Sequence, residues 1–103
     1  MQLQRRVEGD VTTLAVAGDV DIRSAAELRD AGTRELEEVG CAKLVLDLSG
    51  IEFIDSTGLG ALLGIRLVAE KQDKPVVLHA PSEHVFYVID LAGLSEDFIV
   101  DGI

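Results

Sequence analysis

The stretch Gly50-Ile51-Glu52-Phe53-Ile54-Asp55-Ser56-Thr57-Gly58-Leu59-Gly60 decides the fold of this chain. It follows an apolar run at 44–48 and leads into a second apolar run that begins near Gly58. The first run is typical of a buried strand, and the second has helical periodicity. Ser56 and Thr57 are therefore predicted at a helix N-terminus, where free N–H groups and the helix dipole favour an anion. We expect Ser56 to cap this helix and to be a position that accepts a phosphate.

The residues before this stretch predict a hairpin and a helix. Segments 2–8 and 11–17 are typical of two strands around Gly9-Asp10, and a polar loop is expected at 18–21. The pattern Ser24-Ala25-Ala26-Glu27 has the form of a capping box that starts a helix at Ala25. Its inner side is expected to carry apolar side chains and its end a glycine: Leu28, Ala31, Leu36, Val39 and then Gly40.

The residues after residue 42 predict strands that alternate with helices. We expect a strand buried on both faces at 43–48, a loop at 49–55 and a helix at about 58–72. A strand at 76–78, a helix from Pro81-Ser82 to Gly93 and a short strand at 98–100 complete the order β-β-α-β-α-β-α-β. This order predicts an α/β fold with a mixed sheet of four to five strands, formed by one domain over residues 1–103.

Composition and charge exclude several classes of protein. The net charge of −10 argues against binding to nucleic acid and to anionic membranes, since both need clustered Lys and Arg. The single cysteine, Cys41, excludes an internal disulfide and fits a reducing compartment. The sequence shows neither a signal peptide nor a run long enough to span a bilayer, so no membrane insertion and a cytoplasmic location are expected.

No pattern of an enzyme or of a metal site is present in the sequence. The glycines at 58, 60 and 64 do not follow directly on a strand, as a dinucleotide site requires. His79 and His84 are five residues apart across a predicted strand–helix boundary, which does not favour a shared metal ion. We therefore expect neither catalysis, nor a cofactor, nor a bound metal.

A second polar cluster, Asp19 and Asp21, follows the second predicted strand. By itself this pair is explained by a solvated loop before a helix. Because the carboxyl ends of parallel strands meet at one edge, the pair could instead share a corner with the residues around Ser56. A helix cap needs only one hydroxyl, so this combination predicts a docking surface with a modifiable centre. Its members are Asp19, Asp21, Ile54, Asp55, Ser56, Thr57, Gly58 and Leu59.

The chain resembles the STAS-domain anti-sigma factor antagonists, the phosphorylatable partners of bacterial partner-switching systems. The resemblance covers essentially the whole chain, including the opening hairpin, Gly18-Asp19-Val20-Asp21 and the apolar run at 44–48. Its most specific part is Phe53-Ile54-Asp55-Ser56-Thr57-Gly58-Leu59-Gly60. It implies the STAS fold, with the helices packed mainly on one face of the sheet.

The resemblance also implies a function for Ser56. The partner is an anti-sigma factor that is also an ATP-dependent serine kinase and that phosphorylates Ser56, which family position favours over Thr57. The unphosphorylated antagonist binds this kinase and thereby frees a sigma factor, whereas the phosphorylated form is released. A metal-dependent protein phosphatase then restores the antagonist.

Related STAS domains imply other functions that the sequence leaves open. One is an interaction subunit, without phosphorylation, of a stress-signalling scaffold or of a lipid-transport ATPase. Another is the binding of a small ligand at the same corner.

Overall fold

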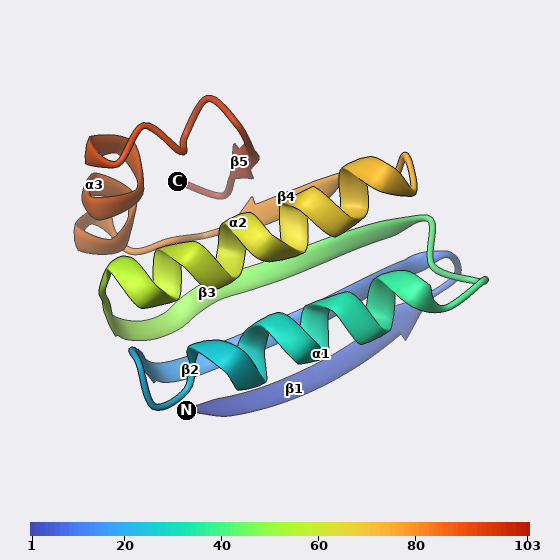
Figure 1. The fold of residues 1–103 in the computed structure, drawn as a ribbon, viewed down its shortest axis with the longest axis horizontal. Coiled ribbons are helices and arrows are strands. Elements are labelled where there is room, and N and C mark those ends of the chain that lie inside the picture. Colours follow the sequence, from blue (N-terminus) through green and yellow to red (C-terminus); the bar gives the residue numbers. More distant parts are fainter.

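A computed structural model describes residues 1–103 as a mixed sheet covered by helices, in the predicted order of elements (Figure 1). The strands lie side by side in the order β1 (Gln2–Glu8), β2 (Val11–Val20), β3 (Lys43–Ile54), β4 (Val76–His79) and β5 (Ile99–Asp101). The helices are α1 (Ala25–Glu37), α2 (Ser56–Lys71) and α3 (Glu83–Leu91). Only the pair β1–β2 is antiparallel; β2 to β5 are parallel. The predicted α/β class is confirmed.

The helices and the sheet enclose one apolar core of 19 buried residues. Figure 1 shows α1 and α2 side by side across one face of the sheet, with α3 near the end of β4. Along β3, Leu44, Leu46 and Leu48 are 0% exposed beneath the helices, whereas Val45 and Asp47 between them are only half-buried. The helices therefore pack mainly on one face, as expected. The prediction that residues 43–48 are buried on both faces is wrong.

The two central strands are longer than the sequence predicts. β2 continues to Val20 and β3 to Ile54, so the loops expected at 18–21 and 49–55 are largely strand. The pairing of β2 with β3 shifts register twice, because β3 contains one extra residue at each of two places. The first lies between the pairs Ala15–Asp47 and Ala17–Gly50, and the second lies just before the pair Asp19–Phe53. Such bulges increase the local twist while the backbone groups on either side stay paired. The result is that β2 and β3 end together.

The start of α1 differs from the predicted capping box. The Ser24 side chain makes no hydrogen bond to the helix. Its hydroxyl instead accepts from the Asp21 N–H at 3.1 Å and donates to the Asp19 carbonyl at 3.0 Å. Ser24 therefore fixes the loop that leaves β2, and this loop is part of the site described below.

The end of α1 also differs from the prediction. The helix ends at Glu37, before the expected Gly40, and Val39 is 100% exposed. Lys74 closes this end, because its ammonium group donates to the carbonyls of Leu36 and Glu38, at 2.6 and 3.2 Å. A side chain from the connection between α2 and β4 thus replaces the predicted glycine cap.

Two local predictions hold at the hairpin and at α3. Gly9 closes the β1–β2 hairpin with φ 62°. Ser82 caps α3 by accepting from the Val85 N–H at 3.2 Å, and Gly93 follows the helix with φ 78°. None of the helices, α2 with its 16 residues included, combines the length and the apolar character needed to cross a membrane.

Candidate functional site

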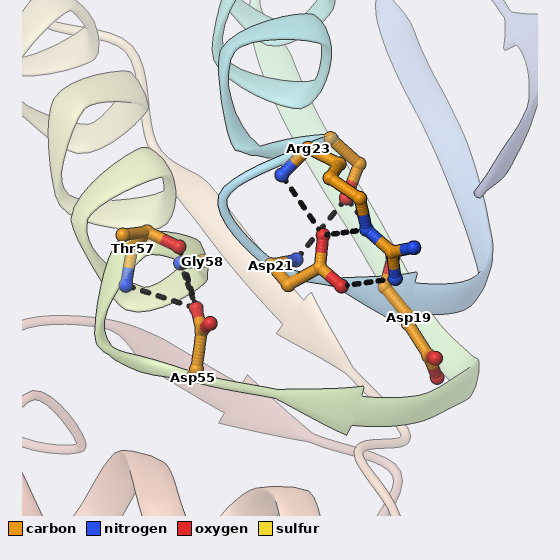
Figure 2. Close-up of polar contacts among 7 residues, drawn as sticks. Asp19, Asp21, Arg23, Asp55, Thr57 and Gly58 are labelled. Atoms are coloured by element: carbon orange, nitrogen blue, oxygen red, sulfur yellow. Dashed lines mark hydrogen bonds and ion pairs between the residues drawn. The ribbon is translucent and has the colours of Figure 1, made fainter.

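The candidate site lies where β2 and β3 end and the chain turns into α1 and α2. Asp19 pairs with Phe53, and Val20 with Ile54, in the last register of the two strands. The Asp55 N–H then donates to the Val20 carbonyl at 3.3 Å, which ties the second turn to the first strand. Figure 2 shows Asp19, Asp21 and Asp55 at this one corner. The structure thus brings together the two acidic clusters that the topology relates.

Asp55, and not Ser56, is the N-cap of α2, so the predicted capping role of Ser56 is wrong. One carboxylate oxygen, Asp55 Oδ1, accepts from the N–H groups of Thr57 and Gly58, both at 3.0 Å (Figure 2). The Asp55 backbone is extended, as in a cap, whereas Ser56 is the first helical residue. The helix begins two residues earlier than the predicted position 58.

The same carboxylate is stabilised in its charged form. The hydrogen bond that the Thr57 hydroxyl donates, at 2.6 Å, lowers the pKa of Asp55, and the Gly58 and Thr57 N–H groups lower it further. Desolvation and the neighbouring charge of Asp21 oppose this shift. Two donors at the N-terminus of α2, the Thr57 and Gly58 N–H groups, are therefore already bound to an anion. A phosphate on Ser56 would find them occupied, contrary to the expectation of an open anion site.

The two hydroxyls of the site differ in their engagement. Both Ser56 and Thr57 are exposed. The Thr57 hydroxyl is bound to Asp55, whereas the Ser56 hydroxyl has no hydrogen-bond partner within the chain. A chemical group can be transferred only to a hydroxyl that its donor can reach. The Ser56 hydroxyl is therefore the more accessible acceptor of the two.

Asp21 holds Arg23, a residue that the sequence analysis did not single out. The Arg23 Nη2 lies 2.7 Å from Asp21 Oδ2, and the Arg23 N–H donates to Asp21 Oδ1 at 2.9 Å (Figure 2). These hydrogen bonds lower the pKa of Asp21. Only the basic character of Arg23 in an acidic loop could have indicated this pair. The Arg23 side chain is 80% exposed, but its guanidinium group is engaged with Asp21.

An open depression of about 380 Å³ borders this corner. It is lined mainly by charged and polar side chains, from Met1, Asp19, Asp21, Arg23, Ser24 and Glu27. Three carboxylates outnumber the Arg23 guanidinium and the Met1 ammonium groups, so the lining is acidic overall.

Two of the predicted surface residues lie inside instead, and a third is only partly exposed. Ile54 is 3% exposed and belongs to the core, so its side chain cannot contact a partner. Gly58 is buried, and a Cβ there would lie 2.6 Å from the Val20 carbonyl oxygen and 2.7 Å from Ile54 Cγ1. Leu59 is partly buried against the core. Gly58 and Ile54 hold α2 against the end of β2, and thereby position Ser56.

Two exposed apolar side chains at this corner escaped the sequence analysis. Ile22, in the loop before α1, is 79% exposed, and Phe53, near the end of β3, is 46% exposed. After the two bulges in β3, Phe53 lies on the exposed side and Ile54 on the core side, whereas the sequence analysis placed Ile54 on the surface. A broken alternation of apolar residues at 51 and 54 was the available signal.

The histidines do not belong to this corner. His79 Nδ1 lies 2.6 Å from Asp101 Oδ1, which links β4 to β5, and His84 is exposed on α3. No group of three or more His, Cys, Asp or Glu side chains is arranged to hold a metal ion.

Comparisons with known proteins agree in sequence and in fold. Residues 3–101 match the family described as "Mlab, STAS domain". The anti-sigma-B factor antagonist of Bacillus subtilis is 35% identical over 81 residues, which cover 79% of this chain and 72% of that protein. The solved structure of an anti-sigma factor antagonist from Mycobacterium paratuberculosis is 25% identical, with a TM-score of 0.85 over 99% of this chain and 86% of the other.

A more distant structure has the same fold in a modified state. The phosphorylated form of SpoIIAA, the Bacillus cell fate determinant, is 19% identical to this chain. It matches with a TM-score of 0.74 over 97% of this chain and 91% of its own.

Proposed function

This chain belongs to the STAS domain family, and from this premise we propose that it is an anti-sigma factor antagonist switched by phosphorylation of Ser56. Unphosphorylated, it binds an anti-sigma factor that is also an ATP-dependent serine kinase, and a sigma factor is freed. Phosphorylation releases the antagonist, and a metal-dependent protein phosphatase restores it. The anti-sigma factor antagonists among its relatives support the first part of this proposal, that the chain is an antagonist.

The observation that carries the assignment of Ser56 is the difference between the two neighbouring hydroxyls. Ser56 is exposed and its hydroxyl is unengaged, while the Thr57 hydroxyl donates to Asp55 at 2.6 Å. Phosphorylation of Thr57 would break this bond and bring a second anion against the capping carboxylate. Phosphorylation of Ser56 breaks no bond within the chain.

The reaction requires only the acceptor oxygen from this chain. Ser56 Oγ attacks the γ-phosphorus of ATP, the bond to the β-phosphate oxygen breaks, and ADP leaves. The hydroxyl proton passes to a base on the kinase. Asp55 contributes by capping α2, which holds Ser56 in the first turn with its side chain in solvent.

The phosphate is expected to act at the contact surface and not through refolding. It adds about 1.5 to 2 negative charges at neutral pH. The Thr57 and Gly58 N–H groups are bound to Asp55, and Arg23 is bound to Asp21, so these donors are already paired with carboxylates before a phosphate arrives. Covered by a partner, an unpaired charge costs several kcal/mol, and about 1.4 kcal/mol is a tenfold change in affinity. The solved phosphorylated form of the cell fate determinant supports a fold that persists after modification.

Binding to the cognate kinase, measured for Ser56→Ala and Ser56→Asp, tests the proposal. Ser56→Ala should bind as tightly as the unmodified wild type and should not be released by ATP. Ser56→Asp should bind at least tenfold more weakly, because it places a charge at the centre of the contact. Gln72→Asp, which adds the same charge at the exposed far end of α2, is the matched control and should bind normally. Equal affinity of Ser56→Ala and Ser56→Asp would remove the basis of the proposal.

A second candidate function is an interaction subunit without phosphorylation, in a stress-signalling scaffold or a lipid-transport ATPase. The family match favours it, because that match extends over the STAS domain as a whole and its description names Mlab. Under this alternative Ser56 would remain unmodified in the presence of ATP and kinase, and Ser56→Ala would have no effect.

A further inference from the structure

We propose that Ile22 and Phe53 are the apolar anchors of the surface on which the kinase docks around Ser56. This inference rests on the proposed function and adds the chemistry of the partner. The kinase surface should offer apolar pockets for these two side chains, bordered by basic residues that face the carboxylates beside them.

Ile22 is placed outside the core by the loop that connects β2 to α1. It is 79% exposed and takes no part in the core cluster. The loop around it is held rigidly, since Ser24 bonds to the Asp19 carbonyl and the Asp21 N–H, and Arg23 bonds to Asp21. An exposed β-branched side chain on a fixed loop loses little conformational freedom on binding, which favours its use as an anchor.

Phe53 reaches the surface because of the second bulge in β3. The extra residue places Phe53 opposite Asp19 in the register, while Ile54 turns into the core opposite Val20. Partners in adjacent strands point to the same face, so the ring of Phe53, 46% exposed, lies beside the Asp19 carboxylate. Phe53 is also near the end of β3, three residues before Ser56.

Each anchor therefore has a carboxylate next to it, Asp21 in the sequence for Ile22 and Asp19 in the sheet register for Phe53. Ile22 follows Asp21, whose charge acts on Asp55, the cap of the helix that carries Ser56. Figure 1 shows the loop before α1 and the start of α2 at the same end of the molecule. Single exposed apolar residues are ordinary, but two of them beside an acidic depression form a mixed apolar and charged contact.

Charge complementarity decides which partner fits this surface. The lining of the depression contains three carboxylates against the engaged Arg23 and the Met1 ammonium group, and the whole chain has a net charge of −10. A second copy docked through this face in a symmetric dimer would bring like carboxylates together, which is unfavourable. A basic protein surface with apolar pockets satisfies both components and would also be attracted over a distance.

The test is the affinity of full-length Ile22→Ser for the cognate kinase, with Val39→Ser as the matched control. Val39 is 100% exposed in the connection between α1 and β3, away from the corner. Ile22→Ser should bind about tenfold more weakly, the loss expected when an anchor of this size is no longer buried, and Val39→Ser should bind like the wild type. The second pair is Phe53→Ala with Leu67→Ala, since Leu67 on α2 is exposed to a similar extent, 49%. Thermal unfolding of each variant separates lost contacts from lost folding.

The outcomes distinguish the inference from the function on which it rests. If the wild type neither binds the kinase nor becomes phosphorylated, both are overturned. If the wild type binds and Ile22→Ser and folded Phe53→Ala bind equally well, only the inference is overturned. If Ile22→Ser abolishes self-association of the free protein and leaves kinase binding unchanged, the surface serves a second copy and the inference is likewise overturned. Rising salt should slow association of the wild type with the kinase if the basic rim is present.

Discussion

Replacing Gly58 by alanine should destabilise the protein, although the same substitution in a helix is usually favourable. The added Cβ would lie 2.6 Å from the Val20 carbonyl oxygen and 2.7 Å from Ile54 Cγ1. Favourable contacts between such atoms require about 3.5–4.0 Å, so something must move. The carbonyl cannot simply retreat, because it accepts the Asp55 N–H that joins the two turns of the site.

The magnitude follows from comparison with Gly60, two residues further along α2. A Cβ on Gly60 would have nothing within 4 Å, and the residue is exposed. Gly60→Ala should therefore stabilise the protein by about 0.5–1 kcal/mol through helix propensity alone. Gly58→Ala receives a similar gain but also a penalty for overpacking of about 1–3 kcal/mol. The difference between the two variants isolates this penalty.

Urea denaturation followed by far-ultraviolet circular dichroism measures this difference. The m-value should be the same for both variants, so that the midpoints report stability directly. Each kcal/mol should also separate the melting temperatures by about 4–8 °C for a chain of this size. If Gly58→Ala is as stable as Gly60→Ala, the close approach of α2 to β2 does not position the site as described.

Three further results are expected. Lys74→Met should lower the free energy of unfolding by about 1–2 kcal/mol, because the ammonium group bonds the last carbonyls of α1; exposed Lys71→Met is the control in the same urea titration. The pKa of Asp55 is lower in the folded protein than in the unfolded chain, where it is about 3.9. The charged carboxylate therefore stabilises the fold at pH values above about 3.9, and this stability is lost as the pH falls through the pKa of the folded state. Between pH 5 and about pH 2, Asp55→Asn should therefore lose less stability than the wild type, as measured by the urea midpoint at each pH. An identical pH profile of the two proteins would contradict the capping interaction. Thr57→Ala should still accept one phosphoryl group from the kinase, as read from intact mass, whereas loss of the modification would place the acceptor at Thr57.

The order of the elements was predictable because each has a strong local signal. The hairpin has Gly9 at its turn, α3 has Ser82 at its start and Gly93 at its end, and β2, β3 and β4 contain apolar runs. These signals act over a few residues and do not depend on the rest of the chain.

The extent of the central strands was not predictable in the same way. Ser49-Gly50 reads as a turn, yet Gly50 pairs with Ala17 in the sheet, where a Cβ would meet the Val16 carbonyl oxygen at 2.9 Å. The bulges that allow this pairing interrupt the period of two on which strand prediction relies. Because residues 49–55 were expected to form a loop, the sides of the sheet could not be assigned there, and the apolar part of the surface was predicted at Ile54, which is buried.

The predicted position of the helix cap differs from the observed one by one residue, for a different reason. Aspartate and serine are both preferred N-caps, and here they are adjacent at 55 and 56. The bond between the Asp55 N–H and the Val20 carbonyl fixes the backbone so that the aspartate occupies the cap. This tertiary contact leaves Ser56 exposed, a result more favourable to modification than the predicted capping serine.

The most direct test of the account is phosphoryl transfer to the wild type, Ser56→Ala and Thr57→Ala, each incubated with ATP and the cognate anti-sigma factor kinase. Intact mass and fragment masses then locate the modification. The account predicts one phosphoryl group on Ser56 in the wild type and in Thr57→Ala, and none on Ser56→Ala. An unmodified wild type, or a Ser56→Ala variant that is phosphorylated as fully as the wild type, would contradict it.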